Sequence, residues 1–243
     1  MTVAGAIIPT TRLEDTIRAL FPRPVAVAVT DPTAPQPVAF AAETRAIASA
    51  REKRRHEFLA GRAAVQAAMR QMGQPPVAVP AGADRAPIWP DGLTGSISHS
   101  DSLCAAVLAD TRSFPALGID IEPAEPLAPD LAPEICTLSE RAWLSSQPEP
   151  GRGLLARLIF SAKECAYKCQ YTLSRTMLEF TDLEITADLE TGQFEATFLR
   201  AVPAFEQGTR LYGRHMTADG HVITGIAARQ MAAAPQERRL SPW

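Results

Sequence analysis

Alternating apolar and polar residues mark the strands that we expect in the first part of the chain. The clearest early stretch is VAVAVT at residues 25–30, and the rest of residues 1–42 is expected to form short strands and loops. LTGSISHS at 93–100 and LCAAVLAD at 103–110 are separated by two polar residues, which is typical of a hairpin or of two adjacent strands. A further strand, ALGIDIE, is expected at 116–122.

A second pattern, with apolar residues three and four positions apart, predicts two long helices. The first runs from about Glu43 to Met72 and ends at Gly73. The second runs from about Gly153 to Leu173. Each helix would turn one apolar face toward a core.

The arrangement of helices and strands repeats along the chain. Two hairpins are expected after the second helix, at 178–199 and 209–229, each with a glycine in its turn. The proline-rich segment EPAEPLAPDLAP at 122–133 is the best boundary and divides the chain into halves 1–123 and 124–243. Each half then holds a long helix and several strands, so the expected fold class is α+β.

Composition limits the class of protein. A chain of 243 residues with 46% hydrophobic content can bury one large core or two small ones. A net charge of −3 argues against a protein that coats nucleic acid. No apolar run approaches the ~18 residues of a membrane span, and the first residues lack the basic and apolar regions of a signal peptide. We therefore expect a cytoplasmic protein without a membrane span.

The cysteines are expected to be core residues of a reduced protein. None of the four forms a CxxC pair, so neither a zinc site nor a disulfide framework is expected. They are Cys104, Cys136, Cys165 and Cys169.

GIDIE, residues 118–122, places two acids on one face of a strand. Side chains alternate between faces, so Ile119 and Ile121 would enter a core while Asp120 and Glu122 point the other way. Their Cα atoms would lie about 6.6 Å apart. Two adjacent carboxylates suit a divalent cation such as Mg²⁺, provided that a third acid joins them. Without it, the acids of a half-exposed strand would simply be solvated.

FSAKECAYK, residues 160–168, holds two of the only three lysines in the chain, Lys163 and Lys168. Glu164 and Lys168 are one helical turn apart, which on a solvated helix face gives only a weak ion pair. Because the other cations are almost all arginine, the two lysines suggest a role for a compact ammonium, such as holding phosphate oxygens. Glu164 could supply the third oxygen ligand.

Two further groups of residues suit a phosphate-bearing ligand. Ser98 and His99 at the end of GSISHS can donate hydrogen bonds to phosphate, although a structural histidine and a Ser-His-Asp triad are alternatives. Arg54 and Arg62 lie on one face of the first helix, about 12 Å apart, and could clasp an anion or form an ordinary solvated basic face. Arg85 is another candidate cation.

GSISHS, GIDIE and FSAKECAYK, in this order, resemble the 4′-phosphopantetheinyl transferase superfamily. RRHEFLAGR and PIWPDG upstream are similar to the enterobactin synthetase component D branch of the surfactin-type enzymes. The resemblance covers roughly residues 40 to 175. It implies a pseudo-dimer of two similar α+β halves with the active site in the cleft between them. It also implies that coenzyme A is cut at its pyrophosphate, that its phosphopantetheine arm passes to a serine of an apo carrier protein, and that 3′,5′-ADP leaves.

The resemblance carries roles for the acids and lysines. Asp120, Glu122 and Glu164 would bind Mg²⁺, and Glu164 would also take the proton of the serine, directly or through water. Lys168 would stabilise the pyrophosphate and the leaving phosphate, and Lys163 would contact phosphate too. These residue types suit phosphoryl transfer, because its barrier is lowered mainly by positioning and by neutralising charge on the transferred group.

The same resemblance assigns the remainder of the coenzyme A site. Ser98 and His99 would hold the adenosine end, with His99 at the 3′-phosphate. Arg54, Arg62 and Arg85 would complete the phosphate clamp, although relatives often carry lysine where this chain has Arg85.

Other functions remain open at this stage. A non-catalytic protein that binds coenzyme A or a nucleotide, and a Mg²⁺-dependent pyrophosphate hydrolase, would need many of the same residues. The motif style favours siderophore synthesis, but the carrier protein could also belong to polyketide, peptide or fatty-acid synthesis. Residues 124–150 border the expected cleft and are a candidate docking surface. A pseudo-dimer completes its own site, so a monomer is expected.

Overall fold

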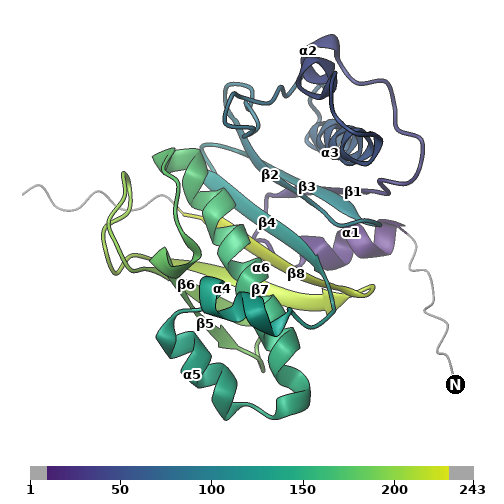
Figure 1. Cartoon of the computed structure of the whole chain (residues 1–243). Helices are drawn as coiled ribbons and strands as arrows, with labels where there is room; N and C mark the ends of the chain where they lie inside the picture. Colours follow the sequence, from purple (N-terminus) through teal and green to yellow (C-terminus); the bar gives the residue numbers. More distant parts are fainter. Residues whose placement is uncertain (1–9, 230–243) are drawn as a thin grey trace, which may run out of the picture.

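The computed structural model describes residues 10–229 and has an α+β fold with two antiparallel sheets (Figure 1). This agrees with the fold class expected from the sequence. The first sheet has three strands and the second has five.

The three-stranded sheet has the order β1-β3-β2. Its strands all pair antiparallel, and the expected hairpin joins β2 to β3 with His99 opposite Cys104. The strands are β1 (Ala26–Thr30), β2 (Leu93–His99) and β3 (Cys104–Asp110).

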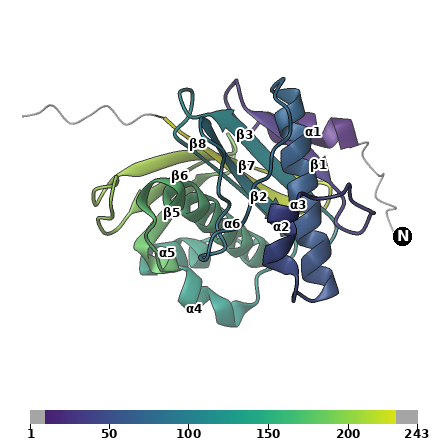
Figure 2. The ribbon, with the colours of Figure 1, turned by 90° about the horizontal axis from the view of Figure 1, so that it is seen from above.

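Helices cover both faces of this sheet (Figure 2). The long α3 packs on one face, where its alanines and Met69 meet Ala106 and Leu108 of β3. On the other face, Leu13 and Ile17 of α1 pack on the valines of β1 and β3. The helical segments of this part are α1 (Thr10–Arg18), α2 (Ala41–Thr44), η1 (Arg45–Ile47) and α3 (Glu52–Gln71).

The edge strand β1 is shielded by side chains. The N–H of Val27 donates to the Gln71 side chain (3.3 Å), and the N–H of Val29 donates to Glu14 (3.1 Å). Two helices thus satisfy the amides that point away from the sheet.

The five-stranded sheet has the order β4-β8-β7-β6-β5, with antiparallel neighbours throughout. Both expected hairpins are confirmed, and Asp219 and Gly220 turn between β7 and β8 with positive φ angles of 47° and 71°. Such angles are typical of a tight hairpin turn. The strands are β4 (Ala116–Pro123), β5 (Leu183–Asp188), β6 (Gln193–Phe198), β7 (Arg210–Ala218) and β8 (His221–Ala228).

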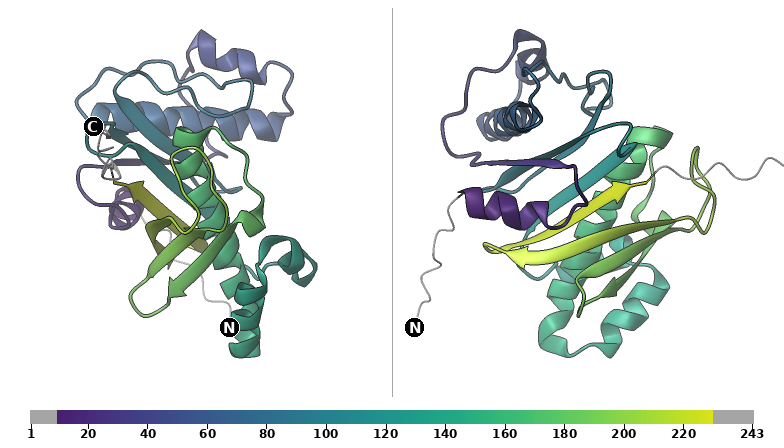
Figure 3. Two further views of the ribbon diagram at one scale, coloured as in Figure 1. Left: turned by 90° about the vertical axis from the view of Figure 1, so that its left-hand side faces the viewer. Right: turned by 180° about the vertical axis from the view of Figure 1, so that it is seen from behind.

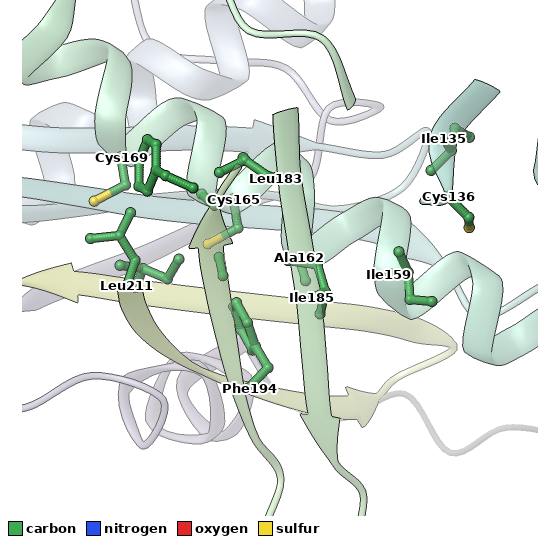
Figure 4. Close-up of a cluster of buried hydrophobic side chains, with 14 of the residues drawn as sticks. Ile135, Cys136, Ile159, Ala162, Cys165, Cys169, Leu183, Ile185, Phe194 and Leu211 are labelled. Atoms are coloured by element: carbon green, nitrogen blue, oxygen red, sulfur yellow. The ribbon is translucent and has the colours of Figure 1, made fainter. Parts of the chain in front are cut away.

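The long helix α6 crosses one face of the five-stranded sheet (Figure 3). Its buried residues, including Ala162, Cys165 and Cys169, pack on Leu183, Phe194 and other side chains of the sheet (Figure 4). The helix comes so close to β4 that a Cβ on Gly118 would lie 2.2 Å from the carbonyl oxygen of Cys165. The remaining helices are η2 (Pro129–Leu131), α4 (Ala132–Ile135), α5 (Leu138–Ser146), α6 (Glu149–Ser174) and η3 (Phe180–Asp182).

Side chains, not a backbone ladder, join the two sheets where β2 meets β4. The hydroxyl of Ser96 accepts the N–H of Ile119 (3.1 Å), and that of Ser98 accepts the N–H of Ile121 (3.2 Å). Ile119 and Ile121 lie in the core beneath the first sheet, as the alternation predicts. Asp120 therefore faces α6.

The structure differs from the sequence expectations at three places. Residues 10–18 form a helix, the long first helix is interrupted before Glu52, and the unexpected helix α5 follows the proline-rich segment 122–133. The α5 start carries a capping box, in which the Thr137 hydroxyl accepts the N–H of Glu140 and the Glu140 carboxylate accepts the N–H of Thr137. That sequence signal was missed.

All four cysteines are buried and free, as expected of core residues. Within residues 10–229, no helix combines the length and the apolar character that crossing a membrane requires.

Candidate active site

A cavity of about 850 Å³ lies between the two parts of the molecule. One wall is formed by α3 and β2, another by α6, and a third by residues 80–88. These residues form a short hairpin, in which the N–H of Ile88 donates to the carbonyl of Pro80 and Ala81 bridges to Pro87. Five of the sequence-predicted site residues reach this cavity: Arg54, Arg62, Arg85, His99 and Lys168.

Lys168 reaches from α6 to the acidic strand. Its Nζ donates to Oδ1 of Asp120 (2.6 Å) and to Oγ of Ser98 (3.0 Å), which leaves one N–H for another acceptor. Burial alone would lower the pKa of Lys168, but attraction to Asp120 and Glu164 more than offsets it, so the pKa is raised. The ammonium therefore stays charged at neutral pH, with 27% of the side chain exposed.

The hydroxyl of Ser98 is used inside the protein. It donates to Oδ1 of Asp120 (2.9 Å) and accepts from Lys168 and from the N–H of Ile121. Ser98 is buried, and its single hydrogen is already donated. A hydrogen bond from Ser98 to a phosphate, as expected from the sequence, would have to break this arrangement. Ser98 instead holds Lys168 and Asp120 together.

The three acids of the motifs lie close enough to influence one another's protonation. Burial, and then repulsion by Asp120, raises the pKa of Glu122 to about 7, against the opposing effect of Arg157. Burial also raises the pKa of Glu164, against the opposing effect of Lys168 and with a smaller contribution from Asp120. Oδ2 of Asp120 is buried and has no hydrogen-bond partner among the described residues.

The donor set fits a hard divalent cation. No group of three or more metal-binding side chains in the described part of the chain is arranged to hold an ion. Within residues 10–229, Oδ2 of Asp120 nevertheless has no hydrogen-bond partner and could bind a cation, and burial, more than repulsion between the acids, raises the pKa values of Glu122 and Glu164. Carboxylate oxygens are the ligands that Mg²⁺ prefers.

Arg157 was missed in the sequence. Its NH1 donates to Oε2 of Glu122 (2.9 Å), and its Nε donates to the carbonyl of Glu125 (3.2 Å). Arg157 is the cation that partly neutralises Glu122. Its position on α6, one turn before the FSAKECAYK motif, was the only available signal.

His99 and Arg54 meet at the opposite wall of the cavity. NH1 of Arg54 lies 3.2 Å from Nε2 of His99. Oε2 of Glu57 lies 3.7 Å from NH1 of Arg54 and 3.8 Å from Nε2 of His99. Burial lowers the pKa of His99, with Glu57 opposing and Arg54 adding to the effect. His99 is then neutral at pH 7 and accepts from Arg54 through Nε2, so Nδ1 carries the proton. Glu57 was not singled out from the sequence.

Arg62 is a buried cation beside the same wall. Its guanidinium stacks 4.2 Å from the ring centroid of Phe58, and its Nε has no hydrogen-bond partner within residues 10–229. Burial lowers the pKa of Arg62 to about 10, although Glu43 opposes this. A buried N–H donor without an acceptor at a cavity wall suits an anionic ligand.

Arg85 sits near the tip of the 80–88 hairpin, with an exposed side chain and a positive φ of 67°. Two tyrosines of α6, Tyr167 and Tyr171, line the cavity opposite the hairpin. Tyr171 Oη donates to Oδ2 of Asp84 (2.8 Å). Neither tyrosine was among the site residues predicted from the sequence.

Lys163 is not brought to this cavity, which corrects the phosphate contact expected for it. Its Nζ lies 2.7 Å from Oε2 of Glu140 and donates to the carbonyls of Ile135 (2.8 Å) and Phe180 (2.9 Å). These three acceptors use all its N–H donors, and the side chain is 1% exposed. Lys163 therefore ties α6 to α4, α5 and η3 inside the second half.

The assembled groups can bind a ligand with several phosphates and handle a proton. Arg54, Arg62 and Arg85 supply positive charge along the cavity, and Lys168 supplies it beside the acids. Glu164 has a raised pKa, so it can accept a proton more readily than an ordinary carboxylate.

Comparisons with known proteins agree with this chemistry. A family model described as the 4′-phosphopantetheinyl transferase N-terminal domain matches residues 42–109, and one for the 4′-phosphopantetheinyl transferase superfamily matches residues 116–224. The chain is 36% identical to the 4′-phosphopantetheinyl transferase Npt of Nocardia iowensis over 76% of its own length and 87% of that protein. It is 30% identical to PptT of Mycobacterium tuberculosis over 93% and 97%, respectively.

A third relative supports the branch suggested by the motifs. Enterobactin synthase component D of Salmonella typhi is 43% identical over 144 residues, which is 57% of each chain. With family models matching both parts of the chain and relatives matched over most of their length, the chain belongs to the 4′-phosphopantetheinyl transferase superfamily and is an enzyme of that class.

Proposed function

We propose that the protein transfers the 4′-phosphopantetheine arm of coenzyme A to a serine hydroxyl of an apo carrier protein, with Mg²⁺, and releases 3′,5′-ADP. One observation carries the proposal. The 850 Å³ cavity has arginines and a histidine on one wall and Lys168 on another, next to Asp120, whose Oδ2 is buried without a hydrogen-bond partner within residues 10–229.

The cations would bind the phosphates of coenzyme A. Arg62 supports this role with its unpartnered Nε, and Arg54 and His99 with their position at the cavity wall. His99 would donate from Nδ1 to the 3′-phosphate. Arg85, exposed beside the cavity, would close the clamp from the hairpin.

Asp120, Glu122 and Glu164 would hold Mg²⁺. When bound, the ion would polarise the pyrophosphate and reduce its negative charge. Oδ2 of Asp120, which has no hydrogen-bond partner among the described residues, supports the assignment.

Glu164 would also act as the general base. The serine oxygen would attack the phosphorus that bears the pantetheine arm, directly or with a water relaying its proton to the Glu164 carboxylate. The bond from that phosphorus to the bridging oxygen would break, and 3′,5′-ADP would leave with the electron pair. The remaining N–H of Lys168 would offset the charge on the leaving phosphate, with Ser98 holding Lys168 in place.

The two parts of the chain would form a pseudo-dimer with its active site in the cleft between halves 1–123 and 124–243. The cavity, lined from both parts, supports this arrangement. Such a site needs no second chain, so a cytoplasmic monomer is proposed.

Similarity to enterobactin synthase component D supports a role in siderophore synthesis. Residues 124–150 would dock the carrier protein. Two exposed leucines of this region, Leu131 and Leu138, support that assignment.

Intact mass spectrometry of apo carrier proteins tests the proposal. Peptidyl, aryl and acyl carriers would be incubated with the protein, coenzyme A and Mg²⁺, with EDTA in a parallel sample. We expect a mass gain of one phosphopantetheine that EDTA prevents and that Glu164→Gln abolishes. Binding of coenzyme A without any mass gain, on every carrier, would contradict the transfer; a gain that persists in EDTA would contradict the metal.

A further inference from the structure

The 80–88 hairpin is braced internally and forms one piece of the cavity wall. The N–H of Gly82 donates to the carbonyl of Ala86 (2.8 Å), and the N–H of Ile88 donates to that of Pro80 (2.9 Å). Oδ1 of Asp84 accepts the N–H of Ala86 (3.1 Å). With these bonds the hairpin can shift as a unit on its proline-containing flanks.

One carboxylate joins the hairpin to the opposite wall. Oδ2 of Asp84 accepts a hydrogen bond from Tyr171 Oη (2.8 Å) and lies 3.9 Å from NH1 of Arg175. Arg175 lies over the Tyr171 ring at 5.8 Å, and the Tyr167 ring lies 5.6 Å away. This contact links the first half of the molecule to α6 across the cavity.

Arg85 is the cation that the hairpin presents to the cavity. It follows Asp84 directly, and its positive φ of 67° fixes the direction in which the side chain leaves the hairpin. The Arg85 guanidinium makes no hydrogen bond or ion pair with the part of the chain that the structure describes. The backbone of the hairpin must therefore place it.

We infer that Asp84 and Tyr171 are positioning residues for ligand binding: their hydrogen bond holds the hairpin against α6 and so places Arg85 at the cavity. This inference rests on the proposed function, in which the cavity receives coenzyme A. A hydrogen bond between exposed groups is weakened by solvent, so losing it should change the equilibrium between the held and the open hairpin only about fivefold. The hairpin is thus held, yet it can still open.

Tyr171→Phe tests the inference because it keeps the ring and removes only the hydroxyl. We expect the dissociation constant of coenzyme A, measured by calorimetry, to rise about fivefold, and KM for coenzyme A to rise with little change in kcat. The matched control is Tyr212→Phe, which removes a hydroxyl from an exposed tyrosine on β7. Equal affinities of Tyr171→Phe and the wild type for coenzyme A would overturn the inference.

A double-mutant cycle with Arg85→Gln asks whether Tyr171 acts through Arg85. In the Arg85→Gln background, we expect Tyr171→Phe to cause no further loss of affinity. Additive losses would mean that Tyr171 acts by another route and would overturn the positioning role.

Hydrogen exchange of the free protein separates this inference from the proposed function. We expect faster exchange of the Gly82, Arg85 and Ile88 amides in Tyr171→Phe than in the wild type and in Tyr212→Phe. Unchanged exchange rates in Tyr171→Phe would contradict the claim that the Asp84–Tyr171 hydrogen bond holds the hairpin against α6. Failure of wild-type protein to bind coenzyme A would instead contradict the proposed function, and exchange would then decide the hairpin contact alone.

Discussion

Lys163 and Lys168 belong to one motif on one helix, yet their surroundings differ completely. Five residues on an α-helix correspond to a rotation of about 140°, so the two side chains leave opposite sides of α6. Lys163 enters a closed pair with Glu140, in which both side chains are 1% exposed and every N–H has an acceptor. Lys168 pairs with Asp120 at the cavity, and one of its N–H groups has no acceptor among residues 10–229.

The difference separates a structural ion pair from a reactive one. A closed pair can be stable because every lone pair and proton is satisfied, but it has no donor or acceptor left to bind a ligand. An open pair has spare donor capacity and an oxygen, Oδ2 of Asp120, without a hydrogen-bond partner in the part of the chain that the structure describes. Spare hydrogen-bonding capacity thus distinguishes the two lysines more clearly than burial or charge.

Lys168→Met should have the largest effect on activity. We expect the transfer rate to fall about 10²- to 10³-fold, because the charge on the leaving phosphate loses its cation. Steady-state transfer to a carrier protein measures this, and Lys168→Arg is the matched control for charge alone. If Lys168→Met lowered the transfer rate per folded molecule less than Lys163→Met does, Lys168 would not be the lysine that acts on the ligand.

Lys163→Met should instead lower stability. Removing the ammonium leaves the Glu140 carboxylate buried without its cation, which costs about 3–5 kcal/mol. Urea unfolding followed by circular dichroism gives the free energy of unfolding. Adding Glu140→Gln should recover part of the loss, since the amide oxygen can still accept the N–H of Ile185. No recovery in the double variant would mean that packing, not the unpaired charge, causes the loss.

Arg62→Gln should weaken coenzyme A binding about tenfold with little effect on kcat. Its buried guanidinium is an open donor like that of Lys168, because Nε has no partner within residues 10–229. Calorimetry measures the affinity. The control is Arg112→Gln, which removes an exposed arginine paired with Asp110. Equal affinities for the two variants would exclude Arg62 from the binding site.

The protonation of Glu122, beside the open pair of Lys168 and Asp120, should change with pH near neutrality. The folded pKa of Glu122, about 7, lies above its ordinary value of 4.5, so the folded protein favours the neutral carboxyl. Its contribution to the stability of the metal-free protein is therefore present below pH 4.5 and is lost as the pH rises through 7.

Mg²⁺ requires the ionised carboxylate, so its affinity should rise as the pH rises from 6 to 8, with proton release. Calorimetry in two buffers of different ionisation enthalpy counts the protons. Glu122→Gln should lose the release, whereas a variant of the closed pair, Glu140→Gln, should keep it.

Helices and strands were predicted well from the sequence where the apolar and polar residues follow a single period and one face of the element is exposed. Alternation placed Ile119 and Ile121 in the core, and the Asp219-Gly220 turn joined the expected strands. The prediction from sequence failed for α1. The apolar stripe of this helix, Leu13 and Ile17, is only one turn long, and the segment was therefore assigned to strands and loops.

The candidate site was predicted only as far as its motifs. The same motif could not tell Lys163 from Lys168, since α6 is covered on several sides and a helix face alone does not reveal which side borders a cavity. Partners distant in the sequence were also missed. Glu57 approaches His99, and Arg157 binds Glu122, only because the chain folds β2 beside α3 and β4 beside α6.

The two side chains that cover the edge of β1 have a consequence for how the protein behaves at high concentration. An uncovered strand edge is a template on which a second chain can add a strand, and such additions lead to aggregates. Glu14 and Gln71 already occupy the amides of Val29 and Val27. A second molecule would have to displace a carboxylate and an amide from two separate helices before it could pair there, so this edge resists self-association.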